Sequence, residues 1–207
     1  MTPSASPRQQ LLTLLAKQSF KLGNFQLSSG ARSDYYIDCR TTTLDAEGGR
    51  LTGLAILDLL TEHHLHPHAV GGLTMGADPV VSAVAIASAQ RHAEQGKGRL
   101  IHGFLVRKAE KQHGTGRRIE GFAPPSGAEE QTPVLIVDDV CTTGGSTITA
   151  IEAANAANMK VIAVVCLVER TEANGRPAVE AAANGAPFLS LFAADDVRAE
   201  HIKYMPM

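Results

Sequence analysis

Two adjacent carboxylates, Asp138 and Asp139, stand between an apolar run and a loop of small hydroxylic residues. The run before them is apolar and mostly β-branched, and threonines, a glycine pair and a serine follow before a helix-period segment begins. This order predicts a buried strand, a tight loop and the first turn of a helix. Backbone N–H groups at such a helix start, together with the positive end of the helix dipole, suit a phosphate. Two acids beside an anion site favour a ligand that also brings hydroxyls or Mg²⁺, such as a phosphorylated sugar.

Two better-known phosphate-binding loops do not match this segment. A Walker A loop requires a lysine before its Ser or Thr, and the stretch from Val134 to Thr147 contains none. A dinucleotide-binding loop requires G-x-G-x-x-G after a strand, and that spacing is missing at this corner. A purely structural interpretation, in which the acids close a strand and the glycines turn the chain, stays open. It leaves unexplained why acids, hydroxyls and glycines all gather at one strand-to-helix corner.

The remaining pattern predicts alternating strands and helices that would position this corner. Helices are expected over about 6–18, 45–62 and 79–94, and strands over 24–27, 35–38, 69–72, 100–106, 133–138, 160–168 and 187–192. Repeated strand–helix–strand units favour a mostly parallel sheet with helices on both faces. Ligands of such sheets bind at the carboxyl ends of the strands, where Asp138 is expected to lie.

The periodic pattern is lost between Arg107 and Glu130. This segment is polar, contains glycines and a proline pair, and carries many cations in its first half. A loop of this length inside a compact domain is usually a lid or disordered. A run of charge alone is more often a solvated surface. Because this one follows a strand expected to end beside the phosphate corner, we predict a cationic flap that closes over a polyphosphate.

Composition limits the classes of protein that fit. The chain has 207 residues, which favours a single domain over 1–207, and 44% hydrophobic with 19% charged residues is ordinary for a soluble globular protein. A formal charge of −2 argues against a generally basic nucleic-acid-binding surface. No apolar run approaches a membrane span, and no signal peptide is evident at the N-terminus. We therefore expect no nucleic acid, no membrane and a cytoplasmic location.

The three cysteines, Cys39, Cys141 and Cys166, are scattered along the chain. An odd, scattered set with one member in an apolar strand favours reduced thiols rather than a disulfide framework. Cys141 lies in the phosphate loop, so a reactive thiol is one interpretation and a small filler residue the favoured one.

A histidine-rich segment, His63 to His68, is the competing candidate for a metal site. It stands at an expected helix end, where histidines also suit the negative end of the helix dipole. No cysteine or acid cluster nearby completes a coordination shell, so the structural interpretation is favoured over metal binding.

Several motifs together resemble those of one known family. The stretch VLIVDDVCTTGGST resembles the ribose-phosphate motif of type I phosphoribosyltransferases. FLVRKAEKQHGTGRRIEG resembles the catalytic loop of orotate phosphoribosyltransferases, and FKLGNFQLSSGARSDYYIDCR resembles their N-terminal motif. GGLTMGADPV matches the loop that holds the pyrophosphate side, and the Glu169–Arg170 pair falls where the family has an arginine for the orotate carboxylate. The resemblance covers roughly residues 20–170.

The resemblance implies an α/β type I phosphoribosyltransferase fold, with a central mostly parallel sheet flanked by helices. A small N-terminal hood would comprise about residues 1–40 together with a C-terminal region of about 171–207, and a long flexible catalytic loop would span about 107–131. The implied activity transfers ribose 5-phosphate from phosphoribosyl pyrophosphate (PRPP) to orotate, with Mg²⁺, in pyrimidine biosynthesis. The implied assembly is a homodimer that shares its active sites. The alternatives are a transferase for another base and a PRPP-sensing regulator.

Site residues follow from the resemblance position by position. The implied catalytic residues are Arg107, Lys111, His113, Asp138 and Asp139. The implied PRPP-binding residues are Arg107, Lys108, Lys111, His113, Asp138, Asp139, Val140, Cys141, Thr142, Thr143, Gly144, Gly145 and Ser146. Orotate would contact Tyr35, Tyr36, Ile37, Thr142 and Arg170. No metal site made by the protein alone is expected, because Mg²⁺ would bind mainly through PRPP and water.

Two positions depart from the pattern of some relatives. Ser28 stands where some relatives have a lysine, and Met75-Gly76 stands where some have Tyr-Lys. Two cations that would contact PRPP are therefore missing, so phosphate binding must depend more on the flap, Mg²⁺ and backbone N–H groups. The stretch 122–132 is also unlike the family pattern and is expected to be an expanded surface loop.

Overall fold

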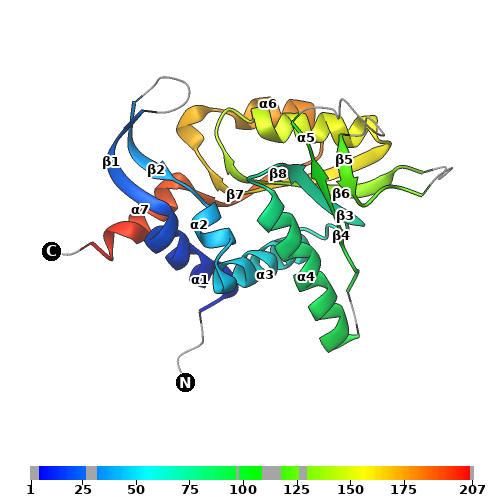
Figure 1. Cartoon of the computed structure of the whole chain (residues 1–207), viewed down its shortest axis with the longest axis horizontal. Helices are drawn as coiled ribbons and strands as arrows, with labels where there is room; N and C mark the ends of the chain where they lie inside the picture. The colour runs from blue at the N-terminus through cyan, green and yellow to red at the C-terminus, as the bar shows by residue number, and fades with distance from the viewer. Residues whose placement is uncertain (1–4, 27–31, 97, 109–117, 126–129, 206–207) are drawn as a thin grey trace.

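The structure is a computed structural model that describes residues 5–26, 32–96, 98–108, 118–125 and 130–205. Its centre is a six-stranded sheet of strand order β5-β4-β3-β6-β7-β8 (Figure 1). The strands are β3 (Ala69–Leu73), β4 (His102–Val106), β5 (Ile119–Gly121), β6 (Thr132–Cys141), β7 (Met159–Glu169) and β8 (Phe188–Ala193). All neighbouring pairs are parallel except β4 with β5. The predicted α/β class with a mostly parallel sheet is confirmed.

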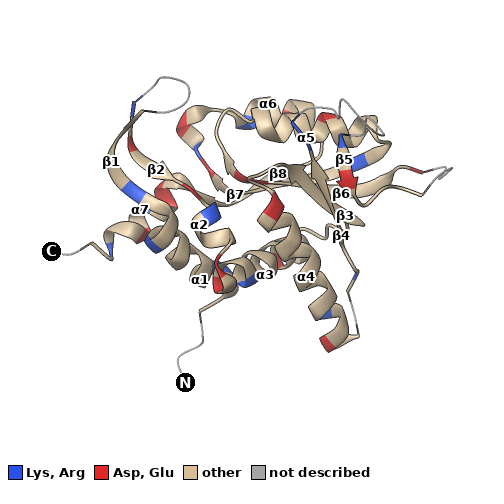
Figure 2. Cartoon of the chain, viewed as in Figure 1, with Lys and Arg blue, Asp and Glu red and all other residues tan. Residues whose placement is uncertain are grey.

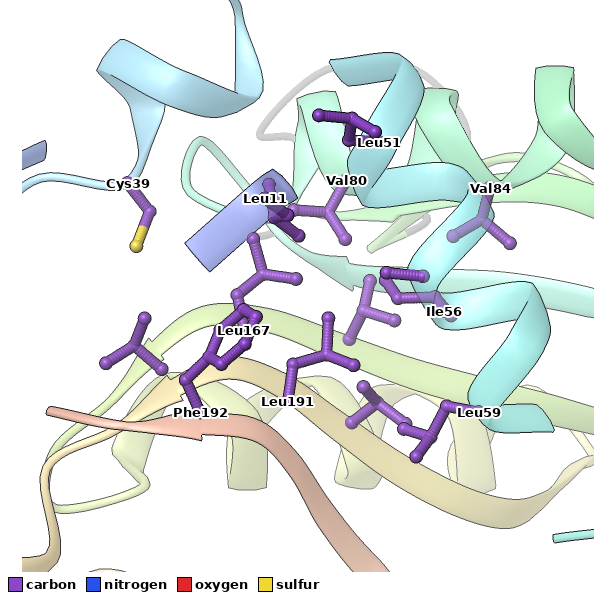
Figure 3. Close-up of a cluster of buried hydrophobic side chains, with 14 of the residues drawn as sticks. Leu11, Cys39, Leu51, Ile56, Leu59, Val80, Val84, Leu167, Leu191 and Phe192 are labelled. Carbon is purple, nitrogen blue, oxygen red and sulfur yellow. The ribbon is translucent and has the colours of Figure 1, made fainter. Parts of the chain in front are cut away.

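Helices cover both faces of the sheet, because the central strands carry apolar side chains on both faces. The helices α3 (Ala46–Glu62) and α4 (Asp78–Gln95) pack on one face, and α5 (Gly145–Ala156) and α6 (Arg176–Ala182) on the other (Figure 1). In β6, Leu135 and Val137 join the core under α3 and α4, whereas Val134 and Ile136 join the core under α5. Successive side chains of a strand point to opposite faces, so a continuous apolar run fits a strand buried on both sides. Figure 3 shows the first of these cores, in which α3 and α4 residues meet β7 and β8.

The start of α3 shows how the sequence sets an element boundary. Asp45 has an extended backbone, and its carboxylate accepts hydrogen bonds from the backbone N–H groups of Glu47 at 3.1 Å and Gly48 at 2.9 Å. An aspartate in this position satisfies N–H groups that the helix itself leaves without partners. The helix predicted to begin there and to run to about residue 62 is confirmed.

A small hood stands beside the sheet. It consists of α1 (Pro7–Leu14), which continues as a π-helix over Leu15–Ser19, and the antiparallel pair β1 (Phe20–Gln26) and β2 (Arg32–Ile37). The last helix, α7 (Ala194–Ile202), packs against it (Figure 1). The ring of Phe20 stacks on Tyr35 with centroids 5.2 Å apart and also contacts His201 at 5.1 Å. These aromatic contacts join the two ends of the chain.

Three details of the prediction were wrong. First, β6 continues past residue 138 to Cys141, so Asp139 also lies on the strand rather than after it. Second, the loop predicted over 107–131 contains β5, which pairs with β4 along its edge. Third, the C-terminal region assigned to the hood contributes β8 to the central sheet, whereas α7 and the turn Thr171–Ala173 contact the hood. The short helix α2 (Arg40–Thr43), the 3₁₀ turn Thr171–Ala173, α6 and α7 were not predicted.

Charged residues are spread over the described part of the chain. Figure 2 shows basic and acidic positions interspersed on nearly every element rather than gathered on one face. A basic position at the start of α2 and an acidic one at the start of α4 stand near the ends of the central strands (Figure 2). Among the described helices, none combines the length and apolar character needed to cross a membrane.

Candidate active site

A cavity of about 550 Å³ opens at the carboxyl ends of β3, β6 and β7, under the edge of the hood. Five segments line it: the end of β2 with the start of α2, the end of β3 with the turn after it, the start of the long loop after β4, the end of β6 with the start of α5, and the residue after β7. The lining residues are Tyr36, Ile37, Asp38, Arg40, Leu73, Thr74, Met75, Gly76, Lys108, Asp138, Asp139, Val140, Thr142, Ser146 and Arg170. The cavity therefore lies where ligands of parallel sheets bind.

Asp138 is a buried carboxylate with a dedicated donor. It is 5% exposed, and its Oδ2 accepts a hydrogen bond from the hydroxyl of Thr147, in the first turn of α5, at 2.6 Å. Its Oδ1 accepts from the backbone N–H of Asp139 at 3.0 Å. Burial raises the pKa of Asp138, with the neighbouring Asp139 charge acting in the same direction and the Thr147 hydrogen bond opposing them.

Asp139 faces the turn after β3. Its Oδ1 accepts from the backbone N–H of Val140 at 2.9 Å, and burial raises its pKa. A Cβ built on Gly76 would stand 2.4 Å from the same Oδ1. That separation is far inside van der Waals contact, so the absence of a side chain at residue 76 lets the Asp139 carboxylate lie against this turn. The peptide bond between Thr74 and Met75 in the turn is cis.

The loop after β6 is shaped by glycines that permit close packing. Gly144 has φ of +81°, a conformation L side chains rarely adopt, and a Cβ there would meet Val179 of α6 at 2.5 Å. A Cβ on Gly175 would stand 2.0 Å from the carbonyl oxygen of Thr142. Helix α5 then begins with no side-chain cap. Its first N–H groups are consequently available to an anion held between Thr142 and Ser146.

Arg170 closes the cavity from the end of β7. Its backbone N–H donates to the carbonyl of Cys141 at 2.9 Å, which joins the ends of β6 and β7. The side chain is buried, with the residue 9% exposed, yet Arg170 lines the cavity. Below it, Cys141 is 1% exposed, and burial raises the pKa of its thiol to about 11. A thiol with such a pKa is protonated at neutral pH, which supports the filler interpretation of Cys141 over a reactive one.

The predicted residues divide into three groups. Nine of them line the cavity: Tyr36, Ile37, Lys108, Asp138, Asp139, Val140, Thr142, Ser146 and Arg170. The others described do not line it: Arg107 is paired with Glu120 at 3.1 Å, Tyr35 is buried behind Arg170, Cys141 is buried below the loop, and Thr143, Gly144 and Gly145 form the loop and helix start. The third group, Lys111 and His113, lies outside the described residues. So does Ser28, which stands where some relatives have a lysine.

Six cavity residues were not named individually as site residues: Asp38, Arg40, Leu73, Thr74, Met75 and Gly76. The last four lie in the motif GGLTMGADPV, which the resemblance assigned to the pyrophosphate side. Asp38 and Arg40 form a fork, with Nε to Oδ1 and Nη2 to Oδ2 both at 2.8 Å, and the Arg40 hydrogen bond lowers the pKa of Asp38. Both residues belong to the D-x-R end of the N-terminal motif, which was the available signal.

A second, larger hollow of about 1130 Å³ adjoins the cavity, between α2 and α4. Asp38, Arg40 and Met75 line both. Three large apolar side chains in this hollow are mostly exposed: Leu44 at 72%, Met75 at 68% and Ile86 at 60%. A patch of this kind beside a site is typical of an interaction surface.

Comparison with known proteins agrees with this geometry. Residues 76–181 match the phosphoribosyl transferase domain family. The orotate phosphoribosyltransferase of Streptomyces coelicolor is 40% identical over 190 residues, which cover 92% of this chain and 96% of that protein. That of Thermosynechococcus vestitus is 42% identical over 195 residues, covering 94% and 95% respectively. The chain belongs to the orotate phosphoribosyltransferase family.

Solved orotate phosphoribosyltransferases also share the fold. The Mycobacterium tuberculosis enzyme in complex with Fe(III) dicitrate superposes with a TM-score of 0.74 at 34% identity, covering 92% of this chain and 98% of that one. The same enzyme in complex with PRPP gives a TM-score of 0.70 at 31% identity, covering 93% and 99%. The expected type I phosphoribosyltransferase fold and the pentosyltransferase class are therefore confirmed.

Proposed function

We propose that this orotate phosphoribosyltransferase transfers ribose 5-phosphate from PRPP to orotate, giving orotidine 5′-phosphate and pyrophosphate in pyrimidine biosynthesis. One observation carries the proposal: a single cavity brings together the buried Asp138 with the half-buried Asp139, an uncapped helix start and a buried arginine. Each of these features complements one part of the two substrates. The family relationship supports the same pair of substrates.

The phosphate and ribose of PRPP fit the β6–α5 corner. The 5′-phosphate would bind the backbone N–H groups between Thr142 and Ser146, where the dipole of α5 favours negative charge. The ribose hydroxyls would donate to Asp138 and Asp139. Because removal from water raises the pKa of both acids, hydroxyl donors would stabilise their charged form and oppose that rise.

The reaction separates charge along the bond that breaks. Departure of pyrophosphate from the anomeric carbon leaves positive charge on the ribose ring, as in other oxocarbenium-like reactions. Asp138 and Asp139 would stabilise that charge, while Lys108 at the cavity wall and Arg107, Lys111 and His113 of the flap would balance the charge on the leaving group. A single well-placed donor to a developing oxyanion contributes about 2.7–4 kcal/mol.

Orotate would bind on the opposite side of the ribose. Arg170 would hold its carboxylate, and Tyr36, Ile37 and Thr142 would contact the ring or its polar edge. The deprotonated N1 of orotate then attacks the anomeric carbon, so no protein nucleophile is required. A base without a carboxylate would give the Nη groups of Arg170 no acceptor in the cavity, which disfavours other bases.

Mg²⁺ fits the oxygen-rich wall of the cavity. The carboxylates of Asp38 and Asp139 are hard donors of the kind this ion prefers, and the substrate phosphates would supply the remainder with water. When bound, the ion would neutralise pyrophosphate charge.

We further place the enzyme in the cytoplasm, because its three cysteines are free and buried.

A second copy of the chain would cover the hollow between α2 and α4. Leu44, Met75 and Ile86 give this surface an apolar centre, and Arg40 and Asp78 give it charges of both signs. The hollow adjoins the cavity through Asp38, Arg40 and Met75. We propose a homodimer built on this surface, whose two active sites are shared through the flap as the family resemblance implies.

Base selectivity tests the proposed reaction. Purified protein is supplied with PRPP and Mg²⁺ and with orotate, uracil, adenine or hypoxanthine, and consumption of each base is followed. We expect orotate alone to be consumed with release of pyrophosphate. Consumption of another base with orotate untouched would overturn the assignment.

A second experiment tests whether the two active sites are shared. Lys111→Ala protein is mixed with Asp138→Ala protein, and recovery of activity in the mixed dimers is expected.

A further inference from the structure

The side chain of Arg170 is held by a network that lies behind the cavity rather than in it. Its Nε donates to two oxygens at once, the hydroxyl of Tyr35 at 2.9 Å and Oε1 of Glu172 at 2.9 Å. Its Nη2 donates to the hydroxyl of Ser33 at 3.2 Å. The guanidinium also stacks over the Tyr35 ring, with Cζ 4.5 Å from the centroid. These contacts fix both the position and the plane of the group.

Glu172 and Tyr35 also bind each other. The Tyr35 hydroxyl donates to Oε1 of Glu172, the same oxygen that accepts from Arg170. Glu172 lies in the 3₁₀ turn after β7, whereas Tyr35 lies on β2 of the hood, so the network joins the hood to the sheet. Burial opposes ionisation of Glu172, but the hydrogen bonds from Tyr35 and Arg170 outweigh it and lower the pKa of Glu172. Glu172 is therefore an anion at neutral pH.

The network occupies one side of the guanidinium and leaves the other available. Within the described residues, Nη1 of Arg170 has no hydrogen-bond partner, and Nη2 has only Ser33. Arginine binds a carboxylate best through two parallel N–H groups in one plane. With Nε engaged by Tyr35 and Glu172, the two Nη groups form the edge that can receive a substrate carboxylate in the cavity.

We infer that Glu172, together with Tyr35, is a positioning residue that orients Arg170 toward the carboxylate of the base. This inference rests on the proposed role of Arg170 in orotate binding. It gives Tyr35 a different task from the ring contact predicted from the sequence: Tyr36 lines the cavity, and Tyr35 acts through Arg170. Neither Tyr35 nor Glu172 is among the described residues that line the cavity.

A merely structural salt bridge would behave differently. The Glu172 side chain is 51% exposed, although that of Arg170 is 10% exposed, and a carboxylate this exposed to water contributes little to folding through its ion pair. Glu180 offers a matched control, because its side chain is 50% exposed and it pairs with Arg176 at 3.3 Å away from the cavity. If both glutamates served only the fold, their removal would have the same small effect.

The test compares Michaelis constants for the two substrates in full-length protein. Glu172→Ala is expected to raise KM for orotate about tenfold, the factor that corresponds to one hydrogen bond to a charged group, and to leave KM for PRPP nearly unchanged. Glu172→Gln keeps an oxygen that can accept from Arg170 and Tyr35, so it should restore most of the orotate affinity. Tyr35→Phe removes one of the two Nε acceptors and should raise KM for orotate alone. Glu180→Ala should match the unmodified protein.

Two results would overturn the inference. One is a Glu172→Ala protein whose constants equal those of Glu180→Ala, and the other is an equal rise in KM for orotate and PRPP. The Arg170→Ala protein distinguishes failure of the positioning role from failure of the proposed function. A large rise in KM for orotate in Arg170→Ala without any in Glu172→Ala refutes the positioning role only. No rise in Arg170→Ala refutes the carboxylate site itself, and the positioning role with it.

Discussion

Replacing Thr147 by valine tests whether Asp138 must be ionised for catalysis. The Thr147 side chain is buried, and its hydroxyl donates to Oδ2 of Asp138 at 2.6 Å. Valine has nearly the same shape, so the substitution removes this donor while it keeps most of the packing. The hydrogen bond stabilises the charged carboxylate, and its loss must raise the pKa of Asp138 further in the direction in which burial already shifts it.

The size of the effect follows from the charge on the acceptor. A hydrogen bond to a charged group contributes about 1.5–3 kcal/mol. One pKa unit corresponds to about 1.4 kcal/mol, so the pKa of Asp138 should rise by roughly 1–2 units. If only the ionised carboxylate supports the reaction, the acid side of the profile of kcat/KM for PRPP moves to higher pH by the same roughly 1–2 units, because this parameter reports groups of the free enzyme.

The assay is the pH dependence of kcat/KM for PRPP at saturating orotate. We expect the Thr147→Val protein to lose about 10–100-fold at acidic pH and to recover toward the unmodified rate at alkaline pH. Thr149→Val is the matched control, because the Thr149 hydroxyl on the same helix donates to the backbone carbonyl of Gly145 at 2.9 Å and to no carboxylate. An acid limb that stays in place in Thr147→Val would refute a requirement for ionised Asp138.

Three further changes probe the site and its surroundings. Gly76→Ala would place a Cβ 2.4 Å from Oδ1 of Asp139. We therefore expect kcat/KM for PRPP to fall at least about tenfold while Tm stays nearly unchanged. Full activity would contradict the close approach of the Asp139 carboxylate to residue 76. Burial raises the pKa of Asp139 above its value in the unfolded chain, so its ionised form destabilises the fold as pH rises. Asp139→Asn should therefore lose activity, while its Tm at pH 8 should equal or exceed that of the unmodified protein. A clear drop in Tm would count against this reasoning. Ile86→Glu puts a charge in the apolar hollow and should give monomers by light scattering with reduced activity, whereas an intact dimer would exclude this surface as the interface.

Elements with a strong local signal could be predicted from the sequence. The helix that starts after Asp45 has its own cap, and the strands β6 and β7 are apolar runs long enough to be buried on both faces. The strand β5 could not be predicted in this way, because its three residues form a strand only through pairing with β4. The end of β6 was misplaced for a related reason: ladder partners on β7 extend the strand through Asp138 to Cys141 despite the change in polarity.

In the candidate site, too, residues of one continuous segment could be predicted, whereas residues brought together by folding could not. The β6–α5 corner is continuous in sequence, and its acids and loop residues were identified directly. Asp38 and Arg40 were missed because they reach the cavity only when the hood folds beside the sheet. Tyr35 and Tyr36 are neighbours on a strand and therefore face opposite ways. One is buried against Phe20 and Arg170, and the other lines the cavity, a distinction that a motif covering both residues cannot make.

The stability and the proposed chemistry of this site depend on the same electrostatic term. Asp138 is buried and the adjacent Asp139 is half-buried, and removal from water raises the pKa of both, so their ionised forms oppose folding at neutral pH. The same removal from water strengthens their attraction for a cationic ribose, because a charge in a medium of low polarity is less screened. Thr147 and the backbone N–H groups of Asp139 and Val140 hold the charged forms in place without neutralising them. Removing the charge of one of these acids, as Asp139→Asn does, should therefore stabilise the fold and weaken transition-state stabilisation at the same time. Thr147→Val keeps the Asp138 carboxyl but removes a donor to its charged form, so its loss of activity should be confined to acidic pH.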